Sequence, residues 1–388
     1  MSFTAAIQKV ASYFALEGGV VAVKRLGGGH INDSWRVTTA TGSEKQQYLL
    51  QRINDRVFPH PELVMENIDR VTVHTSAALQ REAIADSCRR TLTLVRTRTG
   101  AHSHVDESGS YWRVFLFVER TVSHERATSP DLAYQAARTF GEFQRILHDL
   151  PGPRLHETIR SFHDTPQRVA ALERAIAADA HNRCDEARPE IELALSFRAL
   201  APALLAAHDR GEIPERVVHN DAKISNVLFD VNTDEGLCIV DLDTVMPGLA
   251  LYDFGDMARS MATRAAEDET DLSAVTVEPD LFEGVARGYL DGTRDLLARA
   301  ERDLLVTAAR VITYEQGVRF LTDFLDGDRY YSVTRPNHNL DRCRTQLALL
   351  VAMTREVAEL SRLMFTQGRT RPVLIRSAAS PTAAEATG

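Results

Sequence analysis

The chain has 388 residues, of which 44% are hydrophobic and 26% are charged, and its formal net charge at pH 7 is −9. This length allows two or three domains or lobes, and the composition is typical of a folded globular protein rather than a disordered chain. An acidic chain without a basic block is not expected to bind nucleic acid, because phosphate neutralisation supplies most of that affinity.

The sequence predicts neither a membrane-spanning nor a targeting segment. No uncharged apolar run approaches bilayer length, and the start MSFTAAIQKVASYF lacks the basic and unbroken apolar parts of a signal peptide. The four cysteines are far apart and show no CxxC spacing: Cys88, Cys184, Cys238 and Cys343. We therefore expect a cytoplasmic protein with reduced thiols and no membrane partner.

Residues 18–52 alternate in a way that predicts three antiparallel strands. The segments GVVAVKRL, HINDSWRVTT and QQYLLQRIN carry this pattern, and a glycine-rich turn separates the first two. Residues 61–87 have apolar positions at helical spacing, and TLTLVRTRTG and YWRVFLFVERT are typical of two further strands. Residues 1–120 are therefore predicted to form a small β-rich lobe with one long helix.

The character of the chain changes after this lobe. Long Ala/Leu-rich segments separated by Pro, Gly and His predict a mainly helical lobe over residues 121–366. One β-rich interruption lies inside it, where VLFDV and LCIVDL flank a DEG turn and predict a hairpin. The final residues 367–388 are rich in Ser, Ala and Thr, and we expect them to be a disordered tail.

The densest group of chemistry-bearing residues is the segment HNDAKISN, residues 219–226. It fills the four fixed positions of the pattern H-x-D-x-K-x-x-N, and the following hairpin ends in Asp241 and Asp243. Phosphoryl transfer from ATP needs a carboxylate at the acceptor hydroxyl, a cation near the transferred group, and oxygen ligands for Mg²⁺. Taken singly, these residues are typical of turns and strand ends. Their combination favours a kinase.

Eight motifs together resemble the aminoglycoside phosphotransferase and choline kinase group of protein-kinase-like enzymes: GGGHIND, YLLQRIN, VMENI, HNDAKISN, VDLDTVMPG, LYDFGD, VRFLTD and HNLDRCRTQ. DLDTVMPG and NLDRCRTQ are the narrowest, and they resemble the N-acetylhexosamine 1-kinases. The resemblance covers about residues 10–365. It implies an α+β, two-lobed protein-kinase-like fold with a small N-terminal β lobe and a large, mainly helical C-terminal lobe. It also implies phosphorylation of the anomeric hydroxyl of N-acetylglucosamine or N-acetylgalactosamine with ATP and Mg²⁺.

The resemblance also assigns roles to five residues. Asp221 is expected to be the catalytic base, and Lys223 is expected to lie near the transferred phosphoryl group. Asn226 and Asp241 are the expected Mg²⁺ ligands, with Asp243 supporting the metal site.

The later motif LYDFGD contains Asp253 and Asp256. Although it looks like the metal-binding DFG of protein kinases, the equivalent position in this chain is already taken by Asp241, Leu242 and Asp243. We expect LYDFGD to hold the catalytic loop by hydrogen bonds rather than to bind metal.

The turn Gly27, Gly28, Gly29 lacks the GK[ST] of a P-loop and the third glycine of a dinucleotide fingerprint. It is either an ordinary hairpin turn or a loop whose backbone N–H groups cover the phosphates of ATP. Its place at the start of a kinase-like lobe favours the second interpretation. The following HIND segment either faces the cleft or stabilises the turn.

A kinase small lobe needs a cation on its third strand, paired with a helix carboxylate. The third strand here contains no lysine after Tyr48, which departs from the kinase pattern. Arg52, with Glu66 as partner, is our candidate, because arginine binds phosphate bidentately. Adjacent strand residues point to opposite faces, so either Gln51 or Arg52 faces the nucleotide, but not both.

The segment Phe117, Val118, Glu119 falls where a hinge would offer backbone groups to adenine. For the acceptor, a sugar pocket needs planar polar side chains and an aromatic wall, and residues 312–333 offer several. By resemblance, Arg319 and Tyr330 are the best candidates for sugar contacts, and Tyr314 is a further one. Tyrosines are also common as half-buried packing residues.

Two alternatives remain open from the sequence. The acceptor could be an aminoglycoside, choline, homoserine or another hexose, or the chain could be a non-catalytic pseudokinase scaffold. The complete HNDAKISN motif argues against the scaffold, whereas the missing third-strand lysine argues for it. We expect a monomer or a weak homodimer whose partner is a small-molecule sugar.

Overall fold

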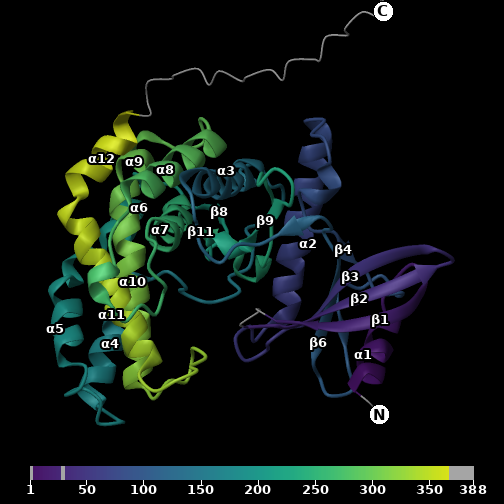
Figure 1. Cartoon of the computed structure of the whole chain (residues 1–388), viewed down its shortest axis with the longest axis horizontal. Coiled ribbons are helices and arrows are strands. Elements are labelled where there is room, and N and C mark those ends of the chain that lie inside the picture. Colours follow the sequence, from purple (N-terminus) through teal and green to yellow (C-terminus); the bar gives the residue numbers. More distant parts are fainter. Residues whose placement is uncertain (1–2, 28–30, 367–388) are drawn as a thin grey trace, which may run out of the picture.

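The computed structural model describes residues 3–27 and 31–366. Gly28, Gly29 and the predicted tail 367–388 lie outside the described residues. Figure 1 shows a β-rich part, coloured purple to blue, beside a larger, mainly helical part coloured teal to yellow. This is the arrangement of a small and a large lobe that the sequence predicts.

The small lobe is built on an antiparallel sheet with strand order β1-β2-β3-β6-β4, and β5 also pairs with β6. The three expected N-terminal strands and the long helix are confirmed. The segment TLTLVRTRTG forms only a two-residue strand, because a turn closed by Gly100 N donating to Thr97 O follows it. The elements are α1 (Phe3–Ser12), β1 (Gly19–Leu26), β2 (Asp33–Thr41), β3 (Glu44–Arg52), α2 (Pro61–Arg81), η1 (Ser87–Arg89), β4 (Leu94–Val95), β5 (His104–Val105) and β6 (Tyr111–Leu116).

The two faces of this sheet have different neighbours. One face, which we call the outer face, packs on α1 through a cluster that includes Trp35, Tyr48 and Leu50. On the other, inner face, Leu49 and Phe115 join the main core, which also contains residues of α2 and of the large lobe. Because strand residues alternate between faces, this packing decides which side chains of β2, β3 and β6 point toward the large lobe.

The large lobe is mainly helical and contains a three-stranded sheet, β10-β9-β7, and a two-stranded one, β11-β8. The predicted hairpin is confirmed as β9 and β10. The elements are β7 (Thr121–Val122), α3 (Pro130–Leu147), α4 (Thr165–Ala178), α5 (Arg188–Ser196), η2 (Arg198–Leu200), α6 (Ala203–Asp209), β8 (Arg216–Val218), η3 (Ile224–Asn226), β9 (Val227–Asp230), β10 (Gly236–Ile239), η4 (Leu242–Thr244), β11 (Met246–Gly248), α7 (Ala250–Met261), η5 (Leu272–Ala274), α8 (Pro279–Thr293), α9 (Arg299–Asp303), α10 (Leu305–Leu325), α11 (His338–Arg355) and α12 (Val357–Thr366).

Helices α3 and α8 approach each other closely because glycines line their contact. A Cβ atom at Gly284 would lie 2.5 Å from the carbonyl oxygen of Pro130, and one at Gly288 would lie 2.2 Å from that of Tyr134. Gly292, one turn further along α8, is equally tight. These glycines are four residues apart and therefore share one face of α8. The backbones of the two helices meet without side chains between them.

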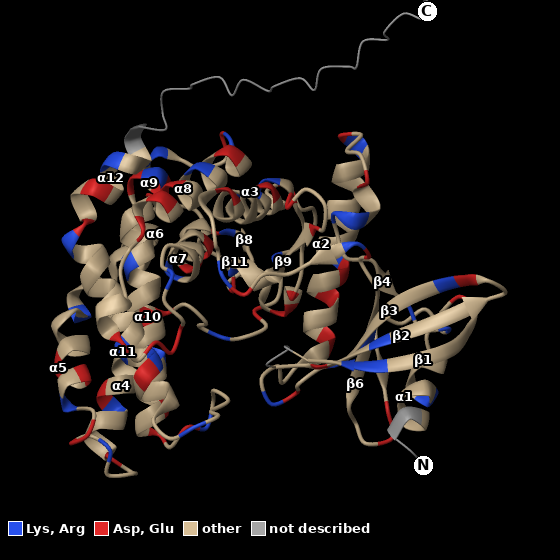
Figure 2. Cartoon of the chain, viewed as in Figure 1, with Lys and Arg blue, Asp and Glu red and all other residues tan. Residues whose placement is uncertain are grey.

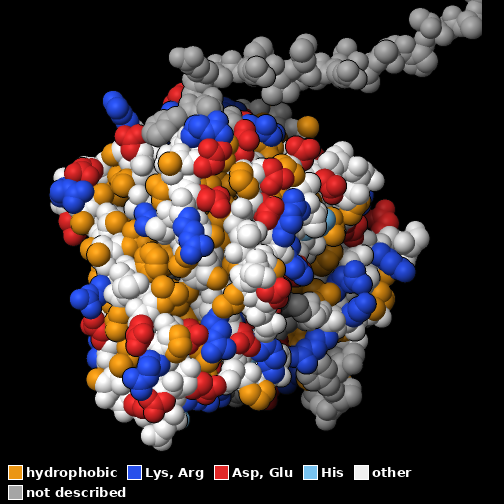
Figure 3. Space-filling view, turned by 60° about the vertical axis from the view of Figure 1, so that its left-hand side comes forward, with side chains coloured by type: hydrophobic (Ala, Val, Ile, Leu, Met, Phe, Trp, Pro, Cys, Tyr) orange, Lys and Arg blue, Asp and Glu red, His pale blue; other side chains and the backbone are white. Residues whose placement is uncertain are grey.

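On the surface that Figure 3 shows, acidic and basic side chains are interspersed with apolar ones, and no single-sign region stands out. By length and composition alone, one stretch of the described chain, Arg188–Asp209, could cross a membrane. In the fold it is divided into α5, η2 and α6, and Ile191 and Leu204 from this stretch lie in the hydrophobic cores.

The glycine contact predicts that Gly288→Ala destabilises the protein. Alanine favours a helix over glycine by about 1 kcal/mol, but overpacking against backbone atoms that cannot rotate away costs about 1–3 kcal/mol or more. We expect a net loss in the free energy of unfolding, measured by denaturant titration. Gly19→Ala is the control, because nothing lies within 4 Å of its added Cβ. Equal stability of Gly288→Ala and wild type would contradict the close approach.

Candidate active site

The HNDAKISN segment runs between β8 and β9, and its first two residues, His219 and Asn220, anchor it to the surrounding structure. His219 is fully buried, and its ring lies edge-on against that of Phe140, with centroids 5.3 Å apart. Asn220 has a left-handed backbone, with φ of 66°, and its side-chain amide donates to the carbonyl of Thr244 at 3.0 Å. Asparagine tolerates this conformation better than most residues. The backbone therefore turns sharply just before Asp221.

Asp253, on α7, holds this turn. Its two carboxylate oxygens accept the backbone N–H groups of His219 at 2.9 Å and Asn220 at 2.7 Å, and Gln144 of α3 donates to it at 2.6 Å. The side chain of Asp253 is fully buried. The prediction that LYDFGD holds the catalytic loop by hydrogen bonds is confirmed for Asp253. Asp256 instead pairs with Arg259 one turn later on the same helix.

Asp221, Lys223 and Asn226 form one connected group. Lys223 Nζ lies 2.8 Å from Asp221 Oδ2, and the side-chain amide of Asn226 donates to the same oxygen at 3.0 Å. Burial by itself raises the pKa of Asp221, but the ammonium group of Lys223 outweighs it and holds that pKa well below its usual range. Asp221 is therefore ionised at neutral pH and is held in one orientation.

Asp241 is brought to this group by the hairpin. The backbone N–H of Val240 donates to the carbonyl of Asn226 at 2.9 Å, and Asp241 follows with a left-handed φ of 60°. Burial, and then the carboxylates of Asp243 and Asp221, raise the pKa of Asp241. The structure thus brings Asp221, Lys223, Asn226 and Asp241 together. Figure 2 shows acidic residues gathered near β8, β9 and β11.

Oxygen donors are present for a hard cation. Within the described residues there is no group of three or more His, Cys, Asp or Glu that could hold a metal. Asp241, however, makes no ion pair or side-chain hydrogen bond in the described chain, and nearby carboxylates disfavour its charge. An amide oxygen from Asn226 and a carboxylate from Asp241 fit Mg²⁺, which is usually held by one or two carboxylates together with substrate phosphates.

Asp243, which is expected to support the metal site, is engaged by protein groups. Its side chain is buried, and its carboxylate forms an ion pair with Arg113 of β6, in which Arg113 Nη2 lies 3.0 Å from Asp243 Oδ2. Asn32 also donates to Asp243 Oδ2, at 2.6 Å. Asp243 is therefore occupied by two small-lobe side chains. Sequence reasoning did not identify Arg113, since nothing in its local sequence marks it.

The expected pairing of Arg52 with Glu66 is wrong. Arg52 lies on the outer face of the sheet, forms an ion pair with Asp33, and is about half exposed. Glu66 instead lies 3.0 Å from His156. The alternation of the strand explains this result: Tyr48 and Leu50 pack on α1, so Arg52 shares their face and Gln51 occupies the inner one.

The glycine turn, for which a phosphate-covering role is predicted, is only partly described. Gly27 is exposed, with open space around it, while Gly28, Gly29 and His30 lie outside the described residues. Of the two further polar residues in this segment, Asn32 reaches Asp243 in the large lobe, whereas Asp33 stays on the outer face.

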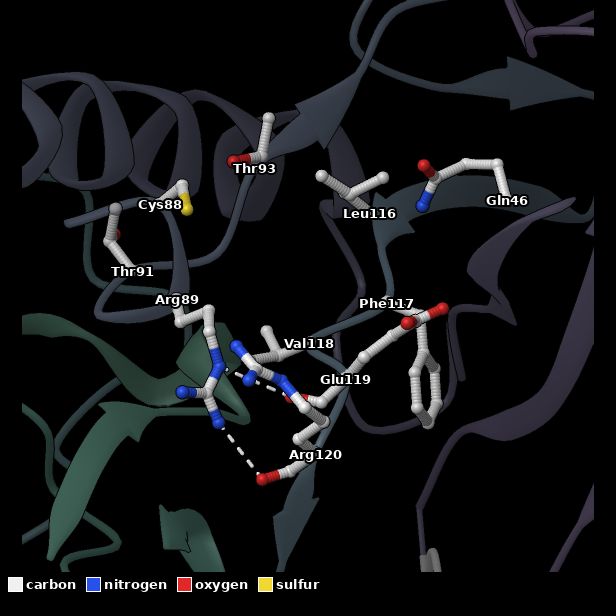
Figure 4. A pocket seen from close by; sticks show the side chains of 10 residues that line it. All are labelled: Gln46, Cys88, Arg89, Thr91, Thr93, Leu116, Phe117, Val118, Glu119 and Arg120. Atoms are coloured by element: carbon white, nitrogen blue, oxygen red, sulfur yellow. Dashed lines mark hydrogen bonds between the residues drawn. The ribbon is translucent and has the colours of Figure 1, made fainter. Parts of the chain in front are cut away.

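The predicted hinge residues line a cavity of about 220 Å³. Figure 4 shows Arg89 of η1 reaching the backbone of Glu119 and Arg120, to whose carbonyls it donates at 3.2 and 2.9 Å. The other lining residues are Gln46, Cys88, Thr91, Thr93, Leu116, Phe117 and Val118. None belongs to the Asp221 group, so this cavity is separate from that group. In the described chain, the carbonyl of Phe117 and the N–H of Glu119 have no hydrogen-bond partner and remain available.

Of the predicted acceptor residues, Arg319 and Tyr330 line a second cavity of about 140 Å³. The guanidinium of Arg319 lies 4.8 Å from the ring centroid of Phe162 and 5.7 Å from that of Tyr331. Tyrosine and carboxylate neighbours, Asp221 among them, raise the pKa of Arg319 despite its burial. Tyr330 is 56% exposed.

Tyr314 is not part of this cavity, and its assignment to the acceptor site is wrong. It is fully buried, and its hydroxyl donates to the carbonyl of Ala194 at 2.9 Å. Five residues separate it from Arg319, which is about 140° around a helix. The two side chains of α10 therefore point in different directions.

A second unpredicted link joins α10 to the catalytic loop. The ring of His163 lies between Glu315 Oε1, at 2.7 Å, and the carbonyl oxygen of Asn220, at 3.0 Å. The ring of His163 therefore connects Glu315 of α10 to the backbone of the loop at Asn220. A single histidine 57 residues from its loop partner gives no sequence signal.

Comparison with known proteins agrees with this architecture. A model of the phosphotransferase enzyme family matches residues 22–295. A spectinomycin phosphotransferase in complex with ADP and spectinomycin has a similar structure, at 10% identity and a TM-score of 0.56, covering 91% of this chain and 99% of that one.

Two further solved structures are similar. The aminoglycoside phosphotransferase from Alicyclobacillus acidocaldarius subsp. acidocaldarius DSM 446 has 14% identity and a TM-score of 0.54, over 91% of this chain and 96% of that one. The choline kinase from Cryptosporidium parvum Iowa II has 11% identity and a TM-score of 0.53, over 93% and 98%. At such identities these similarities show the fold, and the predicted two-lobed kinase-like fold is confirmed. The family match ends before α10.

The role of Asp253 predicts the outcome of Asp253→Asn. An asparagine amide cannot accept a second backbone N–H, so one buried donor loses its charged partner, at a cost of about 1.5–3 kcal/mol. We expect that loss in the free energy of unfolding, together with faster hydrogen exchange at the amides of His219 and Asn220. Asp271→Asn, at an exposed position, is the control. Unchanged protection of the two amides would contradict the assignment.

Proposed function

Because the chain belongs to the phosphotransferase enzyme family, we propose that it transfers the γ-phosphoryl group of ATP to the anomeric hydroxyl of an N-acetylhexosamine. The acceptor is N-acetylglucosamine or N-acetylgalactosamine. The observation that carries the chemistry is the single group formed by Asp221, Lys223, Asn226 and Asp241, with Asp221 ionised. The acceptor assignment is supported by the resemblance of DLDTVMPG and NLDRCRTQ to N-acetylhexosamine 1-kinases.

Asp221 orients the acceptor hydroxyl and receives its proton. A carboxylate with a lowered pKa is a weak base, so most of its contribution is orientation, and the proton moves late. This fits phosphoryl transfer, whose loose transition state requires little help from a base. Lys223 stabilises the charge on the transferred group. Mg²⁺ held by Asn226 and Asp241 would neutralise the triphosphate.

The hinge and the glycine turn hold the nucleotide in this proposal. The carbonyl of Phe117 accepts a hydrogen bond from the amino group of adenine, and the N–H of Glu119 donates to a ring nitrogen. Both backbone groups lack a partner in the described chain. Recognition by the main chain explains why the hinge sequence carries no distinctive motif.

The surroundings of Arg319 favour a neutral sugar over choline. A quaternary ammonium group binds to the faces of aromatic rings. Here the rings of Phe162 and Tyr331 already face the guanidinium of Arg319, which forms no ion pair with a carboxylate in the described chain. Its remaining N–H groups are free to donate to hydroxyl or acetamide oxygens.

Substituting Asp221 tests the chemistry. We expect Asp221→Asn to lower kcat by at least about a hundredfold, the range for a lost general base, in an assay of ADP release with N-acetylglucosamine. Binding of ADP, measured by calorimetry, serves as the control that the variant is folded. Equal low activity in variant and wild type would favour the non-catalytic scaffold.

A second test concerns the acceptor. We expect Arg319→Met to raise the KM for N-acetylglucosamine by about 10- to 100-fold, the value of hydrogen bonds from a charged donor. Tyr314→Phe should leave that KM unchanged, since its hydroxyl is bonded inside the core.

The product is then identified by ³¹P NMR, after offering N-acetylhexosamines, an aminoglycoside, choline, homoserine and glucose. Phosphate at the anomeric position of an N-acetylhexosamine is the expected result. Phosphate on an aminoglycoside hydroxyl would overturn the acceptor assignment while leaving the kinase chemistry intact.

A further inference from the structure

A row of polar side chains crosses the inner face of the small-lobe sheet. Ser34 of β2, Gln51 of β3 and Arg113 of β6 lie directly opposite one another on neighbouring strands. Gln51 donates to Ser34 Oγ at 3.0 Å and accepts from Arg113 Nε at 3.0 Å. The side chain of Arg113 is about 1% exposed. The only cation in this row therefore comes from β6, where a kinase small lobe would use β3.

All three nitrogens of the Arg113 guanidinium are bonded to protein groups. Its Nε donates to Gln51, and its two terminal nitrogens contact the two carboxylate oxygens of Asp243. A planar guanidinium matches a carboxylate in this bidentate way, which a lysine ammonium cannot do. The partner carboxylate lies two residues after Asp241.

Asp241 thus sits between two fixed points. Before it, the N–H of Val240 is bonded to the carbonyl of Asn226. After it, Asp243 is held by Arg113, and the carbonyl of Asp243 accepts from the Thr158 hydroxyl at 2.8 Å. Two anchored neighbours leave the left-handed backbone of Asp241 little freedom. The backbone position from which the Asp241 side chain extends is therefore fixed relative to Asn226.

We propose that Arg113 is a positioning residue for the metal-binding loop and that it acts through Asp243. The inference rests on the proposed function, because it concerns how Asn226 and Asp241 are held for Mg²⁺. Asn32 extends the link, since it donates to Asp243 and follows the glycine turn by three residues. The small lobe therefore fixes the metal-binding loop from two of its segments.

The simpler interpretation is a buried ion pair that only stabilises the fold. Arg216 and Glu301 provide a matched control for it. They form a bidentate pair of similar burial, with two contacts of 2.8 Å, and join β8 to α9. Breaking either pair leaves a buried carboxylate without its partner and costs stability. Asp243 lies two residues after the proposed ligand Asp241, whereas Arg216 lies ten residues before the proposed ligand Asn226.

The experiment compares Arg113→Met, Arg113→Lys and Arg216→Met with wild type. Binding of Mn²⁺ in the presence of ADP is followed by electron paramagnetic resonance, and unfolding is followed by denaturant titration. We expect Arg113→Met to weaken Mn²⁺ binding by about 10- to 100-fold, as for residues that orient metal ligands. Arg113→Lys should recover part of that loss, because lysine keeps the positive charge but cannot form the bidentate contact. Arg216→Met should lose stability only.

A kinetic readout separates positioning from acceptor binding. The Mg²⁺ concentration for half-maximal rate should rise in Arg113→Met, while the KM for the acceptor stays within about twofold. Unchanged Mn²⁺ binding in Arg113→Met would overturn the proposal, since it would mean that Arg113 does not act on the metal site. Tighter binding would also overturn it, since it would mean that Asp243 is a ligand that Arg113 blocks. If Arg113→Met does not fold, Arg113→Lys decides by the same two criteria.

These outcomes are distinguishable from failure of the proposed function. If wild type binds Mn²⁺ and ADP but phosphorylates none of the acceptors, the effect of Arg113 on Mn²⁺ binding still tests the positioning role. If wild type binds no ADP, the proposed function itself fails, and with it the inference.

Discussion

The structure depends on a single electrostatic constraint, which is that three aspartates converge where the two lobes meet. Carboxylates this close raise one another's pKa unless cations or metal ions neutralise them. Lys223 neutralises Asp221, and Arg113 neutralises Asp243. Asp241 forms no ion pair within the described residues, and burial, together with the carboxylates of Asp243 and Asp221, raises its pKa. Asp241 is therefore the aspartate whose charge a bound cation would neutralise, as the proposed function requires.

The two neutralising cations come from different lobes, which links electrostatics to architecture. Lys223 lies in the loop that Asp253 holds from α7, so its position is set within the large lobe. Arg113 comes from the inner face of the small-lobe sheet, and its position is set by the register of β3 and β6. The contact of Arg113 with Asp243 therefore both joins the lobes and neutralises one of the three carboxylates.

The sequence predicted those parts of the site that are local. HNDAKISN and the hairpin after it bring Asp221, Asn226 and Asp241 together through short-range connections, and Asp253 holds the loop as expected. The pair of Arg113 and Asp243 could not be predicted, because 130 residues separate its members and the match depends on sheet register.

The side of the sheet on which Arg52 lies could not be predicted either. It depends on the packing of the sheet against α1, a helix that the sequence analysis did not predict. Tyr314 did carry a signal, since it shares an apolar helical stripe with Val318, Leu321 and Leu325.

The glycines of α8 have a consequence for the active site as well. Through Tyr289, which donates to Gln144 at 2.6 Å, α8 sets the depth at which α3 offers Gln144 to Asp253. Because the glycines have no side chains, α3 and α8 approach each other closely, and this short distance sets the position of the catalytic loop. Replacing the glycines of α8 with larger residues would impair catalysis without altering any residue that touches the substrate.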